Sequence, residues 1–195
     1  MRVFVVYCHP SDDSFTYNVY DNFVKGLKAA GHEIVVSDLY KMDFITDMSE
    51  EEYLKETFYK ADIPVAEDVR LEQEKIQNSD AIVFIYPVFW TEAPAKLVGW
   101  FDRVWTTGFA YNPKPQMKVL DKALAIACAG KSLKTLTETG EKAAMETVML
   151  GDRIRSRAKE KQMVIFDNIT HWNEELRENT MPVHLREAYK LGVEF

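Results

Sequence analysis

Short apolar segments that alternate with helical patterns constrain the fold of this chain more than any other feature of its sequence. Five of them are predicted to be strands, at residues 2–7, 33–38, 81–86, 123–129 and 163–166. A short and continuous apolar run is typical of a strand covered on both faces, as in a parallel sheet. Strands that alternate with helices along the chain indicate an open α/β sandwich with helices on both faces of the sheet.

The segments between these strands carry the signals of helices. Phe15, Val19 and Phe23 begin an apolar repeat of four residues, which lies between the capping sequence 11–14 and Gly31. This pattern predicts a helix, so the first forty residues form a strand-helix-strand unit. Further helices are expected from residue 50, over 71–76, from residue 94, over 141–161 and over 182–191.

The glycine motifs distinguish between the two common strand orders of such sheets. The sequence has no G-x-G-x-x-G after its first strand and no G-x-x-x-x-G-K-S/T. Their absence disfavours a dinucleotide-binding Rossmann site and a P-loop nucleotidase. We therefore expect a flavodoxin-like fold, with a five-stranded parallel sheet of order 2-1-3-4-5. No repeat or linker divides the 195 residues, so residues 1–195 are predicted to form a single domain.

Charge and hydropathy exclude several classes of protein. The 31 acidic residues exceed the 24 basic ones, and the net charge of -7 disfavours nucleic acid as a partner. The longest apolar run, residues 81–90, is about half of the roughly 20 residues that a transmembrane helix requires, so no integral membrane segment is expected. The first residues lack the pattern of a secretory signal. A cytoplasmic protein is therefore expected.

The cysteines and histidines do not predict a disulfide or a metal site. Cys8 and Cys128 end the first and fourth strands, which the predicted order separates by two strand spacings. That separation, about 9.6 Å, exceeds the reach of a disulfide, about 7 Å, so both are expected to be packing residues. His32, His171 and His184 show no metal-ligand spacing, and no metal is expected.

Ligands of open α/β sheets bind at the carboxyl ends of the strands, which here precede the loops 9–16, 87–92 and 128–136. The first loop leads into a helix whose free N–H groups suit a phosphate, and His9 could add a donor. The alternative is that residues 11–14 only cap the helix. Asp12 and Asp13 would repel a phosphate, so we expect them to face solvent.

Aromatic residues are numerous in this chain, with four Trp, nine Tyr and eleven Phe. Phe89 and Trp90 stand in the second loop, just beyond the most apolar strand. Loops are exposed, and large aromatic side chains in water are unfavourable. We therefore expect a planar cofactor or another subunit to cover them, with core packing as the alternative.

The same region carries a resemblance to a known family. The block 86–104, which begins Tyr-Pro-Val-Phe-Trp, and the sequence Gly-Phe-Ala-Tyr at 108–111 resemble the signature of the NAD(P)H:quinone oxidoreductase family of the DT-diaphorase type. His9-Pro10, Ser14-Phe15 and the segment 31–40 are similar to the N-terminal unit of that family. The resemblance covers residues 1–131 and is weak beyond Gly130.

The resemblance implies a bound flavin, FAD or alternatively FMN, with NAD(P)H as co-substrate. The implied cofactor-binding residues are His9, Ser14, Phe15, Thr16, Pro87, Val88, Phe89, Trp90, Thr91, Asp102, Cys128, Ala129, Gly130 and Lys131. Trp90 would lie against the flavin ring, and Asp102 would reach the cofactor of a partner subunit. Trp90 and Tyr111 are implied to line the substrate pocket.

The chain departs from the family after the fourth strand. Cys128 and Ala129 stand where the family has two threonines, so only backbone N–H groups would serve there. Leu136 and Lys142 align with a tyrosine and a histidine that stabilise charge on the reduced flavin. Lys142 could supply a positive charge in place of that pair, which makes it a candidate for stabilising the flavin's charge.

These observations predict an enzyme, a homodimeric flavin-dependent NAD(P)H dehydrogenase that reduces a quinone-like acceptor by a ping-pong mechanism. No side chain is required as a nucleophile. A reductase of nitro or azo compounds would share the site. A regulatory flavoprotein subunit of a potassium efflux system is a further alternative, for which the polar segment 47–78 could encode docking. Otherwise, that acidic segment is expected to form a solvated face.

Overall fold

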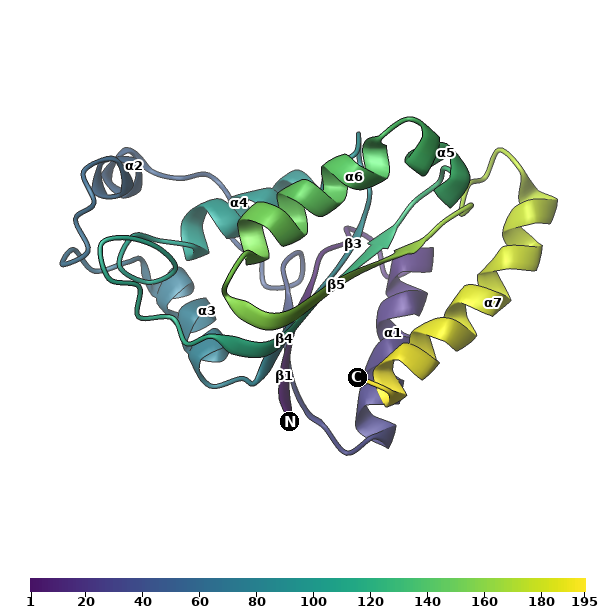
Figure 1. Cartoon of the computed structure of the whole chain (residues 1–195), viewed down its shortest axis with the longest axis horizontal. Helices are drawn as coiled ribbons and strands as arrows, with labels where there is room; N and C mark the ends of the chain where they lie inside the picture. The colour runs from purple at the N-terminus through teal and green to yellow at the C-terminus, as the bar shows by residue number, and fades with distance from the viewer.

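A five-stranded parallel sheet lies between two layers of helices in the computed structural model, which covers residues 1–195 (Figure 1). The strands are β1 (Arg2–Tyr7), β2 (Glu33–Asp38), β3 (Ala81–Pro87), β4 (Leu120–Cys128) and β5 (Ala158–Phe166). The helices are α1 (Phe15–Ala29), α2 (Glu50–Thr57), α3 (Glu67–Gln77), α4 (Ala95–Val104), α5 (Leu133–Glu138), α6 (Glu141–Glu146), the π-helix η1 (Thr147–Ile154) and α7 (Glu174–Val193).

The strand order β2-β1-β3-β4-β5 confirms the predicted topology. All neighbouring strands run parallel, and Val5 of β1 lies opposite Val36 of β2 and Val83 of β3. Because parallel strands end at the same edge, the loops that follow β1, β3, β4 and β5 meet there.

The two faces of the sheet form two separate cores. Val3, Val5 and Tyr7 of β1 are buried against α1 and α7, whereas Phe4 and Val6 face the opposite core. This second core includes buried residues of α3, α4 and η1. Alternate residues of a strand point to opposite faces, so a strand buried on both faces must be apolar throughout. The continuous apolar runs of the sequence are therefore explained.

Helices α1 and α7 are in backbone contact on one face of the sheet, where Figure 1 shows them side by side. A Cβ atom added at Gly26 would lie 2.2 Å from the carbonyl oxygen of Tyr189, and one added at Gly192 would lie 2.2 Å from that of Phe23. Only glycine permits this approach at either position.

The predicted elements differ from the structure mainly in the C-terminal part. The helix expected over 141–161 ends at Ile154, and residues 158–162 belong to β5 instead. β5 is an edge strand whose residues 159–162 are exposed, so they are polar and give no apolar run. Likewise, α7 begins at Glu174 rather than near Pro182. The prediction missed its first two turns because they are largely exposed and carry no apolar stripe.

The two cysteines are buried and unpaired, which confirms that they do not form a disulfide. Burial raises the pKa of both the Cys8 thiol and the Cys128 thiol to about 12. None of the helices combines the length and the apolar character needed to cross a membrane.

Candidate functional site

Two cavities adjoin at the carboxyl edge of the sheet. The first, which we call the His9 cavity, has a volume of about 680 Å³ and is formed by the loops after β1, β3, β4 and β5 and by the first turns of α1 and α7. The second, the Trp90 cavity, has a volume of about 420 Å³ and lies between the loops after β3, β4 and β5, Leu136 of α5 and the start of α6. They share Val88 and Gly130 as lining residues, so they form one elongated site.

Thirteen of the fourteen predicted cofactor-binding residues line these cavities. The His9 cavity is lined by His9, Ser14, Phe15, Thr16, Pro87, Val88, Phe89, Cys128 and Gly130. The Trp90 cavity is lined by Val88, Trp90, Thr91, Ala129, Gly130 and Lys131. The remaining residue, Asp102, lies elsewhere.

The start of α1 supplies hydrogen-bond donors to the His9 cavity. Ser14 is the N-cap, and its Oγ accepts from the backbone N–H of Tyr17 at 3.0 Å, so this hydroxyl caps the helix as the alternative proposed. The backbone N–H groups of Phe15 and Thr16 have no partner within the chain. Unpaired N–H groups in the first turn of a helix attract anions.

His9 and the two aspartates set the charge at this end. His9 Nδ1 lies 3.0 Å from the backbone nitrogen of Ser11, so the Nε2 atom remains for a ligand. Burial lowers the pKa of His9 more than the Ser11 backbone raises it. Asp12 and Asp13 are exposed, as predicted; Asp12 pairs with Lys41 at 3.0 Å, whereas Asp13 also borders the cavity.

The loop after β3 presents its aromatic side chains to the outside. Phe89 and Glu92 exchange backbone hydrogen bonds of 2.8 and 2.9 Å across a tight turn, whose central residues Trp90 and Thr91 have φ values of 52° and 68°. Left-handed backbone at a residue other than glycine costs about 1–2 kcal/mol and often marks a functional segment. The turn leaves Trp90 99% exposed and Phe89 47% exposed.

Several lining residues escaped the sequence analysis. They are Asn18, Glu141, Ile169, Thr170, His171, Arg177 and Met181, of which five follow β5. The rule that ligands bind at strand ends, applied also to the fifth strand, would have selected residues 167–173. Arg177 and His171 line the same cavity as Phe15 and Thr16 at the start of α1.

Of the two residues aligned with the family's charge-stabilising pair, Leu136 and Lys142, only Leu136 lines the site. Leu136 is buried and lines the Trp90 cavity. Lys142 lines neither cavity, because its Nζ pairs with Glu146 at 2.6 Å one turn along α6. The ammonium group at the Trp90 cavity belongs to Lys131, which pairs with Glu141 at 2.6 Å. The expected role of Lys142 is thus not supported by its position.

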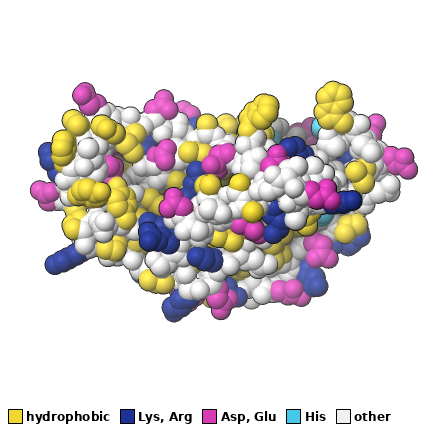
Figure 2. All heavy atoms as spheres, turned by 45° about the horizontal axis from the view of Figure 1, so that its top comes forward, with side chains coloured by type: hydrophobic (Ala, Val, Ile, Leu, Met, Phe, Trp, Pro, Cys, Tyr) yellow, Lys and Arg dark blue, Asp and Glu magenta, His cyan; other side chains and the backbone are white.

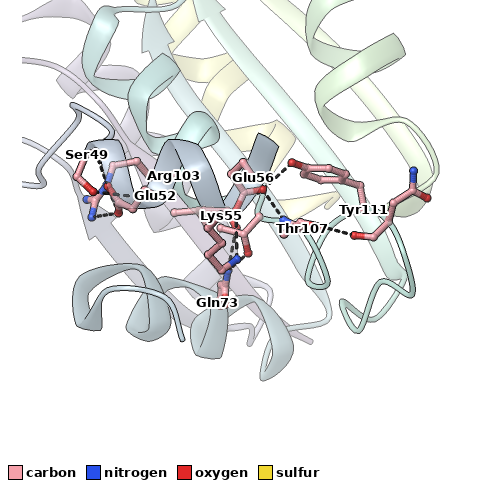
Figure 3. A network of polar contacts seen from close by, with 11 residues as sticks. Ser49, Glu52, Lys55, Glu56, Gln73, Arg103, Thr107 and Tyr111 are labelled. Atoms are coloured by element: carbon pink, nitrogen blue, oxygen red, sulfur yellow. Dashed lines mark hydrogen bonds and ion pairs between the residues drawn. The ribbon is translucent and has the colours of Figure 1, made fainter. Parts of the chain in front are cut away.

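Asp102 and Tyr111 do not reach the two cavities of their own chain. Both line a separate hollow of about 750 Å³ between the end of α4 and residues 152–157. The hydroxyl of Tyr111 donates to Glu56 Oε2 at 2.5 Å, and Figure 3 shows the two side chains pointing toward each other. Burial and then Glu56 raise the pKa of Tyr111, so its phenol stays protonated.

The acidic segment 47–78 is not simply a solvated face, which corrects that expectation. The buried guanidinium of Arg103 binds Glu52 of α2 at 2.7 Å (Figure 3). It also binds Asp68 of α3. Burial alone would raise the pKa of Glu52, but Arg103 and the Ser49 amide lower it overall. Glu72 is completely buried and accepts hydrogen bonds from Ser37, Lys75 and Trp100. Through Arg103, Glu52 and Asp68 hold α2 against α3 and α4. Glu72 instead joins α3 to β2 and α4.

The outer side of the α2 segment carries an exposed apolar patch. Ile45, Tyr53, Phe58 and Tyr59 are each between 57% and 62% exposed. Figure 2 shows apolar side chains gathered at the end of the molecule where α2 lies in Figure 1. An exposed patch of several large apolar side chains is typical of an interaction surface.

Comparison with known proteins confirms the resemblance seen in the sequence. A family model described as flavodoxin-like fold matches residues 1–153. The chain is 36% identical over 124 residues to NAD(P)H dehydrogenase (quinone) 1 of Rattus norvegicus, an alignment that covers 57% of this chain and 45% of the relative. The chain thus spans about half the length of the curated relatives it matches.

Solved structures extend the similarity over the whole chain. An NAD(P)H:quinone oxidoreductase from Methanothermobacter marburgensis is 40% identical, with a TM-score of 0.91, and the match covers 100% of this chain and 95% of that one. An azoreductase from Bacillus anthracis has a TM-score of 0.74 at 18% identity, with 100% of both chains covered, and therefore shares the fold.

Proposed function

The chain belongs to the flavodoxin-like fold family, and we propose that it is a flavin-dependent NAD(P)H dehydrogenase that passes two electrons to a quinone-like acceptor. Support for the activity comes from the names of the relatives, an NAD(P)H:quinone oxidoreductase at 40% identity and curated quinone dehydrogenases. The observation that carries the proposal is the elongated site at the carboxyl edge of the sheet, whose two cavities differ in chemistry.

The residues present fit a flavin nucleotide. The His9 cavity gathers unpaired N–H groups of Phe15 and Thr16 with the basic side chains of His9 and Arg177, which suits a phosphate. The Trp90 cavity offers apolar walls from Val88 and Leu136 and the backbone of a loop with Gly130 at its centre, which suits a flat ring. FAD and FMN share both parts.

The side chains of this chain would then bind and orient the nucleotide. The α1 amides, His9 and Arg177 would hold its anionic end, and Phe89, Trp90 and Lys131 would border its ring. A bound flavin supplies hydride-transfer chemistry, and the protein contributes orientation, charge and exclusion of water. With no side chain needed as a nucleophile, the same face of the site would serve NAD(P)H and the acceptor in turn, which gives ping-pong kinetics.

A homodimer in the cytoplasm is part of the proposal. Asp102 and Tyr111, implied to serve the site, lie outside the cavities of their own chain. A second copy could bring them to its partner's site and cover the exposed aromatic side chains of Phe89 and Trp90. The apolar patch on α2 is a candidate for burial between the copies. Sedimentation of the purified protein tests the dimer directly.

An absorbance spectrum followed by anaerobic titration with NADH and NADPH tests the proposed cofactor and activity. We expect a yellow protein, or one that becomes yellow with added FAD or FMN, that is bleached by either nucleotide and recoloured by a quinone. Protein that remains colourless with excess FAD and FMN would refute the proposal. Mass spectrometry of the released cofactor distinguishes FAD from FMN.

Nitro or azo compounds are the second candidate class of acceptor, because the fold is shared with an azoreductase. Steady-state comparison of kcat/KM for a quinone and an azo dye at one NADPH concentration separates the two. If the protein is instead a regulatory subunit of a potassium efflux system, we expect slow turnover with every acceptor and co-purification with a membrane protein.

A further inference from the structure

Asp167, the first residue after β5, joins its own loop to two other segments, the start of α5 and helix α7. Its Oδ2 accepts from the backbone N–H of Leu133 at 2.6 Å and from the side-chain amide of Asn168 at 3.0 Å. Its Oδ1 lies 3.4 Å from Nε2 of His184, and that same nitrogen lies 3.0 Å from the Asp167 carbonyl oxygen. In Figure 1 the end of β5 lies between α5 and α7, which these contacts join.

Each of these segments carries a wall of the two cavities. Leu133 begins α5, directly after the loop of Gly130 and Lys131 that lines the Trp90 cavity. His184 lies on α7, two turns beyond Arg177 of the His9 cavity. The loop of Asp167 itself contributes Ile169 and His171 to the His9 cavity and Thr170 to the Trp90 cavity.

The backbone of the two loops is joined beside this carboxylate. The N–H of Asn168 donates to the carbonyl of Lys131 at 3.3 Å, and the N–H of Ile169 donates to that of Ala129 at 3.2 Å. Asn168 has a φ of 58°, so the chain turns sharply after β5. A third bond, from the N–H of Ala129 to the carbonyl of Phe166 at 2.8 Å, joins the same two strand ends, but none of the three bonds reaches the start of α5 at Leu133.

Asp167 supplies what these bonds lack. The first N–H of a helix has no partner within the helix, and a carboxylate there is favourable both as an acceptor and in the helix dipole. Because this acceptor comes from a residue 34 positions later, it sets where the Gly130 loop stands relative to β5 and α7. A loop ordered before the ligand arrives lowers the entropy cost of binding.

We propose that Asp167 is a positioning residue that holds the loops after β4 and β5 and helix α7 in the arrangement that binds the flavin. This proposal rests on the proposed function for the identity of the ligand. It predicts that loss of the carboxylate weakens flavin binding without changing turnover once the flavin is saturating.

The test uses the full-length protein stripped of flavin, with Asp167→Ala, Asp167→Asn and His184→Gln as variants. The control is Asp62→Asn, which removes one negative charge, as the Asp167 variants do, but at an exposed residue. Titration with FMN and with FAD, followed by fluorescence, gives Kd. Hydrogen exchange measures the protection of segments 130–138 and 167–172, and urea unfolding measures the global stability.

We expect Asp167→Ala to raise both Kd values about 10-fold, which corresponds to the loss of about 1.4 kcal/mol from one charge-assisted hydrogen bond. Exchange should accelerate in both segments, and kcat at saturating flavin should stay within about twofold of the wild type. Asp167→Asn keeps the size of the side chain but has fewer acceptor atoms, so it should give a Kd between those of the wild type and Asp167→Ala. If the alanine variant fails to fold, Asp167→Asn takes its place in the test. His184→Gln should raise Kd less than Asp167→Ala.

The outcomes separate this inference from the proposed function. Wild-type protein that binds neither flavin refutes the proposed function, whereas the exchange measurement still tests the coupling of the two loops. A Kd of Asp167→Ala within twofold of the Asp62→Asn control overturns the inference. So does a lowered urea midpoint with unchanged Kd, because that pattern indicates a purely structural role.

Discussion

The contact between α1 and α7 gives the sharpest prediction for stability, through the substitution Gly26→Ala. The added Cβ would stand 2.2 Å from the carbonyl oxygen of Tyr189 and 2.9 Å from the Cα of Gly192. Carbon atoms in contact need about 3.5 Å, so α7 must move outward by about 1 Å. Both neighbours are backbone atoms, which cannot be relieved by a change of rotamer.

Two effects oppose each other in the free energy of unfolding. Alanine is favoured over glycine in a helix interior by about 1 kcal/mol. Overpacking costs about 1–3 kcal/mol, and this collision lies at the top of that range because the atoms that Gly26 meets are backbone atoms of Tyr189, Gly192 and Val193. We therefore expect a net destabilisation of about 2 kcal/mol, which lowers Tm by about 4–8 °C for a chain of this size.

Gly151→Ala is the matched control. Gly151 also lies in a helical segment, but its nearest neighbour for an added Cβ is Thr147 Cγ2 at 4.0 Å. The same substitution there should leave Tm unchanged or raise it. Gly192→Ala should resemble Gly26→Ala, and the double variant should lose less stability than the sum of the two, because the outward shift of α7 that one alanine forces also makes room for the other.

Differential scanning calorimetry and flavin titration measure the two consequences. Because α7 carries Arg177 and Met181 of the His9 cavity, a shifted α7 should also weaken flavin binding. A Gly26→Ala variant with a Tm equal to or above that of the wild type would show that the two helices are not held in backbone contact, and would refute the reasoning.

Three further predictions concern the buried thiols, the buried guanidinium and the exposed tryptophan. Burial raises the pKa of Cys8 and Cys128 to about 12 from 9.0, so stability should fall as the pH rises above about 9, where only unfolded thiols ionise. Neither thiol should react with a thiol reagent at pH 8 until urea unfolds the protein, and rapid reaction in native buffer would contradict the burial. Arg103→Met should destabilise by about 2 kcal/mol at pH 7, less than for a fully buried pair because its carboxylate partners are partly exposed. Urea titrations should show that deficit shrinking below about pH 4, since the lowered pKa of Glu52 in the folded state gives stability that is present above the unfolded value and is lost on acidification. Trp90→Ala should leave the urea midpoint unchanged, because the side chain is 99% exposed, yet raise the flavin Kd several-fold; an unchanged Kd would remove the indole from the proposed site.

The sequence was informative wherever burial dictates residue type. β1 and β3 are covered on both faces, so they must be apolar, and α1 shows one buried face as a repeat of four. The three loops that supplied most candidate residues followed from the positions of these strands, and the strand order followed from the absence of the two glycine motifs. β5 and the start of α7 escaped because exposed residues at an edge or on a free helix face are not constrained to be apolar.

Most residues of the candidate site beyond Lys131 were assigned only from the tertiary structure. The alignment made Lys142 the candidate for stabilising the flavin's charge, but in the structure Lys142 pairs with Glu146 on α6. The lysine that lines the Trp90 cavity is Lys131. Similarly, nothing local indicated that Arg177 would line the same cavity as the start of α1.

What the amino-acid sequence determined by itself was therefore the layer architecture and the loops at the carboxyl edge, because period and apolarity record which faces are buried. Only the tertiary structure decided which polar side chains share a cavity. Those pairings depend on contacts between distant residues, such as Gly26 with Gly192 and Asp167 with Leu133. No local pattern records such contacts, because each partner is compatible with its own helix or loop whether or not the other is present.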